Sequence, residues 1–154
     1  MKFEDIILKQ KNSEHIRSKR TKNCLEITLN RPNKQNALTT YMYHTITTLL
    51  NTASEDDSIQ VITLKGTGKS FTSGNDLQNF TLFPELLTNP QLKREVITMM
   101  GNELLYGFVN SFINCKKPII AMVHGNVIGI GFTILGLCDM VYSTKQTVFR
   151  SPLL

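Results

Sequence analysis

The strongest structural signal in this chain is the segment Ile119-Ile-Ala-Met-Val-His-Gly-Asn-Val-Ile-Gly-Ile-Gly-Phe132. It begins with five apolar residues, which predict a strand buried on both faces. Glycine-rich sequence follows, and we expect a short helix from Gly129 to Leu137. Backbone N–H groups at the start of a helix have no partner within it and can bind negative charge. The segment therefore predicts a buried strand that leads directly into an anion-binding loop.

A second segment of the same kind is Phe71-Thr-Ser-Gly-Asn-Asp-Leu77. It follows another buried strand, predicted at residues 59–64, and again places a glycine where a strand ends. Two backbone N–H groups held in place are what an oxyanion site requires. We therefore expect the two glycine segments to form one such site.

Strand and helix patterns alternate along the rest of the chain. A β-branched alternating stretch predicts a strand at 25–29, and apolar residues at helical spacing predict a helix from an N-cap at Thr39 to about Glu55. Further predictions are a loop at 80–89, a long helix at 91–114, and strands at 139–143 and 147–150. This alternation predicts an α/β fold.

The composition argues against several classes of protein. The chain has 154 residues, 41% of them hydrophobic, and no apolar run approaches the roughly 20 residues of a membrane span. Its cysteines and histidines are scattered without the spacing of metal ligands or a disulfide framework, so we expect neither. The motif Gly66-Thr-Gly-Lys-Ser70 is similar to part of a P-loop, but Thr63 stands where its first glycine is required.

The net charge of +5 comes largely from the first 22 residues. We predict that residues 1–22 form an exposed basic arm, a solvated lead-in to the domain. Attraction to an anionic partner, either nucleotide phosphates or nucleic acid, is the alternative. No aromatic residues interleave with the basic ones, which disfavours base stacking and hence nucleic acid.

Three motifs occur in an order that resembles the crotonase (enoyl-CoA hydratase/isomerase) superfamily. They are Arg31-Pro-Asn-Lys-Gln-Asn-Ala-Leu38, the segment 71–77, and Lys117-Pro-Ile-Ile-Ala-Met-Val-His-Gly125 with its continuation to Asp139. Their detail is most similar to the Δ3,Δ2-enoyl-CoA isomerase branch. The resemblance implies a ClpP/crotonase spiral of ββα units, incomplete at the C-terminus, with residues 23–154 as a partial acyl-CoA-binding domain.

The resemblance also implies a site. In the superfamily two backbone N–H groups hold the thioester oxygen of an acyl-CoA, and the matching positions here are Asn75 and Ile130. Flanking positions implied to bind substrate are Ser73, Gly74, Asp76, Leu77 and Gly129. Lys34 is a candidate contact for the CoA nucleotide. No separate cofactor and no metal are implied, because coenzyme A is part of the substrate.

The superfamily's catalytic carboxylates do not map onto this sequence. Hydratases have a glutamate three residues after the second oxyanion amide, where this chain has Thr133, and a hydroxyl is a poor general base. Isomerases carry one carboxylate on a segment that would follow Thr147–Pro152 here, and no glutamate occurs beyond the second glycine segment. We expect a chain that grips the thioester of a 3-enoyl-CoA, as in its conversion to trans-2-enoyl-CoA in fatty-acid β-oxidation, but is inactive alone.

Other functions and properties remain open. A non-catalytic acyl-CoA binder and a coregulator-type interaction module are the alternatives to the isomerase. The resemblance implies a peroxisomal or mitochondrial location, although the sequence contains no recognisable targeting signal. It also implies a homotrimer, which is doubtful for a chain of this length. We expect uncovered apolar strands and marginal stability.

Overall fold

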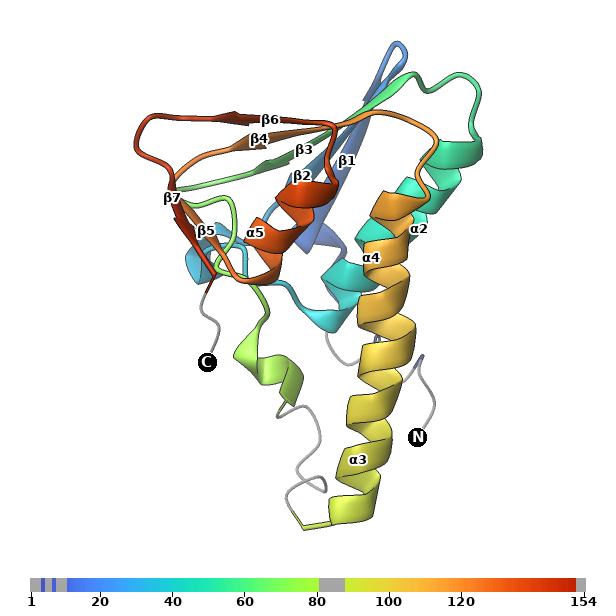
Figure 1. The fold of residues 1–154 in the computed structure, drawn as a ribbon, viewed down its shortest axis with the longest axis vertical. Helices are drawn as coiled ribbons and strands as arrows, with labels where there is room; N and C mark the ends of the chain where they lie inside the picture. The colour runs from blue at the N-terminus through green and yellow to red at the C-terminus, as the bar shows by residue number, and fades with distance from the viewer. Residues whose placement is uncertain (1–3, 5–6, 8–10, 81–87, 152–154) are drawn as a thin grey trace.

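The computed structural model describes residues 4, 7, 11–80 and 88–151 (Figure 1). Its main layer is a five-stranded sheet in the order β1-β2-β3-β4-β6. The first two strands pair antiparallel, and all later pairs are parallel. The bounds are β1 Ile16–Thr21, β2 Cys24–Leu29, β3 Val61–Gly66, β4 Ile119–Val123 and β6 Met140–Ser143. The prediction of an α/β fold is confirmed.

Two helices cover one face of this sheet. Helix α2 (Thr40–Glu55) begins where expected, because the Thr39 hydroxyl accepts the N–H of Met42 at 3.2 Å. A long helical segment packs against α2. It consists of α3 (Pro90–Met99), a π-helix η5 (Met100–Leu105) and α4 (Tyr106–Ile113). The rings of Tyr43 and Phe108 meet edge to face, with centroids 4.8 Å apart. The predicted helix at 91–114 is therefore confirmed, with a π-helical stretch that no pattern indicated.

A second, smaller layer runs beneath the first. It contains β5 (Asn126–Ile128), which pairs in parallel with β7 (Val148–Arg150). Isolated bridges extend it, joining Thr72 to Val127 and Asn75 to Leu38. Each parallel strand of the main sheet is thus followed by a short extended piece in the second layer. Helices follow the first three of these pieces, and that part of the chain repeats the sequence strand, short strand, helix.

Short helical turns complete the fold. They are the 3-10 helices η1 (Ser13–His15), η2 (Pro32–Lys34), η3 (Leu77–Phe80) and η6 (Ile134–Leu137), with helix α5 at Ile130–Thr133. Most of the loop predicted at 80–89 lies outside the described residues. None of the helices described is both long and apolar enough to cross a membrane.

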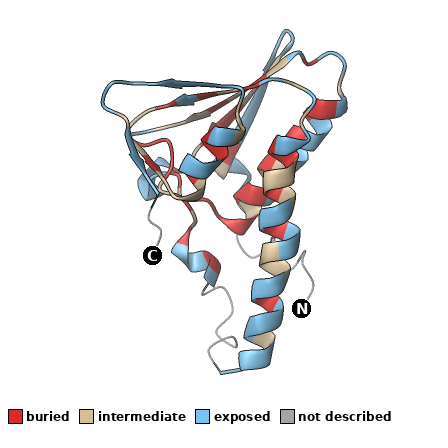
Figure 2. Cartoon of the chain, in the orientation of Figure 1, coloured by how far each residue is buried: buried red, intermediate tan, exposed pale blue. Residues whose placement is uncertain are grey.

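Burial differs sharply between the central strands of the main sheet and the C-terminal strands β6 and β7 (Figure 2). Ile27, Ile62 and Ala121, from three neighbouring strands, have no exposed surface. Every residue of β6 and β7 is exposed, including Tyr142 at 57% and Phe149 at 42%. Uncovered apolar strands were expected, and these two strands fit that expectation.

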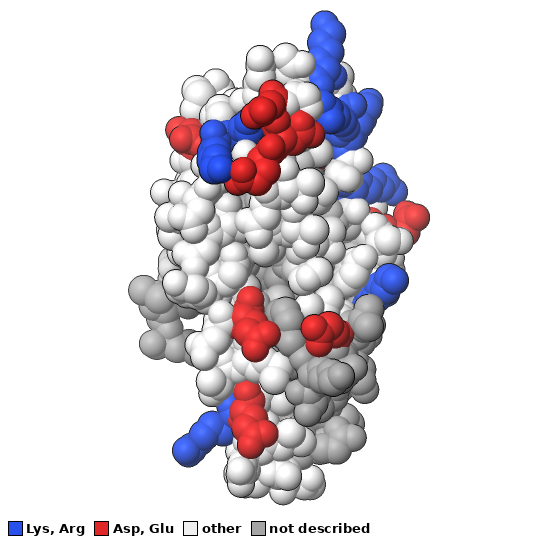
Figure 3. Space-filling model, turned by 90° about the vertical axis from the view of Figure 1, so that its right-hand side faces the viewer, with Lys and Arg blue, Asp and Glu red and all other residues white. Residues whose placement is uncertain are grey.

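The expected basic arm is not a free lead-in. Its residues 16–21 form β1, which pairs along its whole length with β2. Two of its arginines form ion pairs: Arg20 with Asp56 at 3.2 Å and Arg17 with Glu14 at 3.9 Å. Figure 3 shows basic and acidic side chains together at the upper end of the molecule. The charged pattern concealed a strand because only Ile16 of β1 is buried.

Candidate functional site

The two glycine segments lie side by side, as expected. Phe71 N–H donates to the carbonyl of His124 at 2.8 Å, and Thr72 N–H donates to that of Asn126 at 3.2 Å. The Ile128 N–H then returns a bond to the Thr72 carbonyl at 3.1 Å. Three backbone hydrogen bonds therefore hold the segments in parallel over the residues that precede both key glycines.

Gly74 and Gly129 meet where this pairing ends. A Cβ on Gly74 would lie 2.8 Å from the Ile128 carbonyl oxygen and 3.7 Å from the Gly129 Cα. Both glycines have positive φ, +90° and +59°, which residues with a side chain rarely adopt. Close approach and backbone conformation together require glycine at position 74, and backbone conformation favours it at position 129.

The N–H of Asn75 is directed away from the strand that holds it. Leu38 N–H donates to the Gly74 carbonyl at 2.8 Å, and Asp76 N–H donates to the Leu38 carbonyl at 3.0 Å. In a parallel bridge of this kind the residue between the two bonds points its own N–H to the opposite side. Among the residues described, none accepts a hydrogen bond from the Asn75 N–H.

The N–H of Ile130 is the first of helix α5. The Gly129 carbonyl accepts the N–H groups of Phe132 and Thr133 at 2.9 and 3.1 Å, which closes the turn and leaves the first amide of the helix without an intrahelical partner. The Gly129 N–H donates to the Arg150 carbonyl of β7 at 2.9 Å. Within the described part of the chain, the Ile130 N–H likewise has no acceptor.

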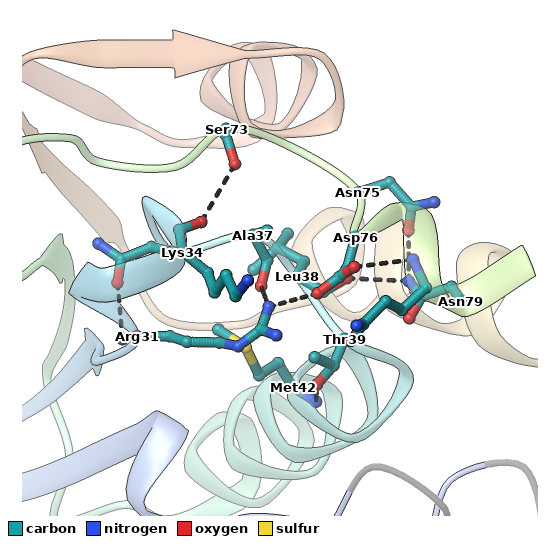
Figure 4. Close-up of polar contacts among 12 residues, drawn as sticks. Arg31, Lys34, Ala37, Leu38, Thr39, Met42, Ser73, Asn75, Asp76 and Asn79 are labelled. Atoms are coloured by element: carbon teal, nitrogen blue, oxygen red, sulfur yellow. Dashed lines mark hydrogen bonds and ion pairs between the residues drawn. The ribbon is translucent and has the colours of Figure 1, made fainter. Parts of the chain in front are cut away.

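A buried ion pair lies behind the first segment (Figure 4). The Arg31 guanidinium donates to the Asp76 carboxylate, and the two side chains are only 9% and 10% exposed. The same guanidinium nitrogen donates to the Ala37 carbonyl at 3.1 Å, and the other oxygen of Asp76 accepts the Gln78 N–H at 2.8 Å. Asp76 is therefore engaged as an acceptor within the protein and is not free to move a proton.

The other predicted site residues are distributed around this centre. Ser73 is half-buried, and its hydroxyl donates to the Lys34 carbonyl at 3.5 Å. The side chain of Lys34 is exposed on η2, and Leu77 is 79% exposed at the start of η3. Thr133 donates its hydroxyl to the Gly129 carbonyl at 3.3 Å. The structure thus brings Ser73 to Asp76 together with Gly129 and Ile130, and leaves Lys34 and Leu77 at the surface.

Sequence reasoning missed the side chains that brace the first segment. Arg31, Asn36 and Asn79 lie in or directly beside the motifs that carry the resemblance, but no role was expected of their side chains. Arg31 and Asp76 are 45 positions apart, so their pairing could not be read from spacing. One signal was present, since asparagine tolerates the left-handed conformation that Asn36 adopts at φ +54°.

Neither the P-loop-like motif nor the histidines form a recognisable ion site. Gly68, Lys69 and Ser70 line an open cavity of about 640 Å³ with Gln35 and Asn126, but they do not lead into a helix. Among residues 4, 7, 11–80 and 88–151, no three His, Cys, Asp or Glu side chains gather closely enough to hold a metal ion.

Comparison with known proteins agrees with this geometry. The family model described as "Enoyl-CoA hydratase/isomerase" matches residues 19–154. Human enoyl-CoA delta isomerase 2 is 43% identical over 127 residues, and the mouse protein named "Enoyl-CoA delta isomerase 3, peroxisomal" is 38% identical over the same length. The solved structure of Pseudomonas aeruginosa OdaA superposes with a TM-score of 0.75 at 32% identity over 91% of this chain.

The chain covers only part of these proteins. It spans 30% of the human isomerase, 38% of the mouse isomerase and 51% of the OdaA chain, while 82% of its own length is aligned with each isomerase. The crotonase-like fold predicted from the motifs is nevertheless confirmed, because both the family model and the superposed structure extend over most of the chain. This chain belongs to the enoyl-CoA hydratase/isomerase family.

Proposed function

We propose that this chain binds the thioester of an acyl-CoA and holds its carbonyl oxygen with the backbone N–H groups of Asn75 and Ile130. The observation that carries the proposal is the junction of Gly74 and Gly129, beyond which both N–H groups lack an acceptor among the described residues. Removal of a proton from the carbon next to the thioester places negative charge on the thioester's carbonyl oxygen. A pair of backbone N–H groups stabilises this enolate oxygen.

The reaction that we propose for the protein is the shift of a double bond from position 3 to position 2 of an enoyl-CoA. Removal of a proton from C2 gives a dienolate, and return of a proton at C4 completes the isomerisation. The relatives named as enoyl-CoA delta isomerases support this over hydration, as does threonine at position 133. Asn75 and Ile130 supply the oxyanion contacts, and neither glycine segment supplies a free carboxylate.

Acetoacetyl-CoA tests the oxyanion contacts without needing a catalytic base. Its enolate absorbs in the near ultraviolet, and a protein that stabilises the enolate increases this absorption at constant pH. We expect the chain to produce a saturable increase. The decisive variant is Ile130→Pro, which removes one N–H at the first position of a helix, where proline is well tolerated.

The matched control is Ile130→Ala, which shortens the side chain but keeps the N–H. We expect Ile130→Pro to weaken enolate stabilisation by about tenfold or more, since one oxyanion donor contributes roughly 10²–10³ to a rate. Ile130→Ala should stay near the unsubstituted chain. Equal enolate absorption in the two variants, both with native circular dichroism, would contradict the proposal.

Non-catalytic acyl-CoA binding is a second candidate. The observation that favours it is the ion pair of Asp76, the one carboxylate in the two glycine segments, with Arg31. A 3-enoyl-CoA distinguishes the two, because isomerisation creates a conjugated thioester with its own ultraviolet absorption. Because this chain is expected to be inactive alone, the assay uses the protein translated from the whole reading frame, and saturable binding without that absorption there would favour the second candidate.

The compartment and the binding partner of the protein are further proposals. The name of the mouse relative supports a peroxisomal protein, and we propose that compartment ahead of the mitochondrion. The proposed partner is the acyl-CoA substrate itself, which carries the coenzyme. Fractionation of cells that express the protein tests the compartment, and a mitochondrial signal would reverse the choice.

A further inference from the structure

The direction of the Asn75 N–H depends on a single bridge to Leu38. The bridge consists of two backbone bonds, one to the Gly74 carbonyl and one from the Asp76 N–H, so it contacts the residues on both sides of Asn75. A rotation of the 74–75 peptide would break the first bond and change the direction of the Asn75 N–H. Whatever fixes this bridge therefore fixes the N–H that the proposed function uses.

The Arg31 guanidinium fixes the bridge from behind. One nitrogen contacts both the Ala37 carbonyl, directly before Leu38, and the Asp76 carboxylate, directly after Asn75. It therefore connects the two strands of the bridge on the side opposite to the free N–H. The backbone of Arg31 is itself held, because its N–H donates to the Asn36 side chain at 2.7 Å.

Asn79 adds a second connection. Its amide nitrogen donates to the Leu38 carbonyl at 2.9 Å and to the Asn75 side-chain oxygen at 2.7 Å. The residue is 2% exposed, so these bonds do not compete with bulk water. Figure 4 shows Asp76 between Arg31 and Asn79, with Asn75 next to Asn79.

Stability alone does not account for the buried ion pair of Arg31 and Asp76. Removing two charges from water carries a large desolvation penalty, and a well-packed apolar pair of similar volume is often as stable as a buried ion pair or more so. The geometry points to a positional role: we propose that Arg31 and Asp76 are positioning residues that orient the Asn75 N–H toward the bound thioester. The identity of the bound thioester rests on the proposed function. The contacts that orient the Asn75 N–H are independent of it.

The test compares a single with a double variant. Arg31→Met leaves the Asp76 charge buried without a partner, whereas Arg31→Met with Asp76→Asn removes both charges and keeps an oxygen for the Gln78 N–H. We expect the double variant to recover much of the stability that the single one loses. We expect it not to recover enolate stabilisation of acetoacetyl-CoA, which should remain about tenfold weaker than in the unsubstituted chain.

Amide hydrogen exchange tests the positioning without a ligand. In the double variant the amides of Leu38 and Asp76 should exchange faster by about tenfold, because their bonds form the bridge. The amide of Phe71, which is bonded to His124 outside the bridge, should keep its rate. The matched control is the exposed pair Arg20–Asp56, where Arg20→Met should alter neither exchange at the bridge nor the enolate absorption.

The outcomes separate the two proposals. Faster exchange confined to Leu38 and Asp76 supports the positional role even if the unsubstituted chain gives no enolate, a result that would count only against the proposed function. Unchanged exchange at these two amides in the double variant would overturn the positional role. Equal acceleration at Phe71 would also overturn it, because the ion pair would then act on the fold as a whole.

Discussion

The two glycine segments present similar backbone groups but are held in different ways. Around the first, polar side chains from elsewhere in the sequence do the holding, above all Arg31, Asn36 and Asn79. Around the second, the contacts are backbone hydrogen bonds and close packing of glycine: a Cβ on Gly125 would lie 1.9 Å from the Lys69 carbonyl oxygen. Backbone amides can therefore be fixed either by buried polar bonds or by the absence of side chains.

The two means of support have different weaknesses. A polar brace loses its effect when one partner is removed, because the remaining group is buried without a bond. A glycine contact loses its effect when any atom is added, because protein interiors have no room to spare. Away from the junction of Gly74 and Gly129, substitutions that remove groups should therefore damage the first segment, and substitutions that add atoms should damage the second.

The largest effect is expected at Gly125. Gly125→Ala adds a methyl group against the Lys69 carbonyl at a residue with φ +60°, and the combined overpacking and backbone strain should cost about 3 kcal/mol. Urea denaturation of the chain measures this loss. Gly136→Ala is the control, since nothing lies within 4 Å of its added Cβ and stability should not fall. Similar losses in both variants would remove the packing argument for the second segment.

Gly74→Ala should follow, because it tests the contact between the segments. Its Cβ would approach the Ile128 carbonyl to 2.8 Å at φ +90°, and we expect a loss of about 2 kcal/mol. Enolate stabilisation should decrease more than stability does, since Asn75 is the next residue. Gly107→Ala, in an open position, is the matched control. A chain with Gly74→Ala that still increases the enolate absorption fully would show that the junction tolerates a side chain.

Thr72 of the first segment makes polar contacts through its hydroxyl and an apolar contact with the second segment through its methyl group, so substitutions can test the two kinds of contact separately. Its hydroxyl donates to the Asn36 carbonyl at 2.7 Å and accepts the Gly74 N–H at 3.1 Å, whereas its methyl carbon lies 2.0 Å from where a Cβ on Gly131 would be. Thr72→Val keeps the methyl and should cost about 1–2 kcal/mol through two lost bonds. Thr72→Ser keeps the hydroxyl and should cost about 1 kcal/mol or less.

Amide exchange at Gly74 and at Thr133, whose N–H donates to the Gly129 carbonyl in helix α5, distinguishes the two variants of Thr72. We expect Thr72→Val to accelerate exchange at Gly74 alone, and Thr72→Ser to affect helix α5 alone. If both variants accelerated exchange at the same amides, the two segments would open together. The proposed difference in how the two segments are held would then be wrong.

The smallest expected effect is a pH dependence of stability that arises from His15. This residue lies close to the Arg31–Asp76 ion pair, which braces the first segment. Burial and then the Arg31 charge lower its pKa below the ordinary 6.5, and Asp76 opposes them. The unfolded chain therefore binds this proton more readily, so stability should fall slightly as the pH drops from about 7 through 6.5 toward the folded pKa. His15→Gln should remove this part of the dependence in urea denaturation at several pH values. An unchanged pH profile would separate His15 from the brace.

Local sequence predicted the elements that have strong local signals. The run Ile119–Val123 is a strand to the residue, and Thr39 caps α2 as expected. Strand β1 was missed because arginine and lysine on an edge strand look like a solvated segment, and β5 was missed because three residues carry no period. The π-helical stretch 100–105 was missed because its sequence continues the helical pattern.

The candidate site was predictable only as far as its backbone. Glycines mark positions where a chain must bend or approach closely, and Gly74 and Gly129 marked the junction correctly. The brace was not predictable, because Arg31, Asp76 and Asn79 come together only once the parallel strands have aligned. Polar pairs that form between distant parts of a chain have no spacing rule to reveal them.

The bond from the Gly129 N–H to the Arg150 carbonyl has a consequence for the order of assembly. A chain emerging from the ribosome presents its N-terminal part first, at about 5–20 residues per second. The brace of the first segment needs nothing beyond Asn79, whereas Gly129 has to wait for β7. We therefore expect a nascent chain to complete one half of its anion-binding backbone well before the other.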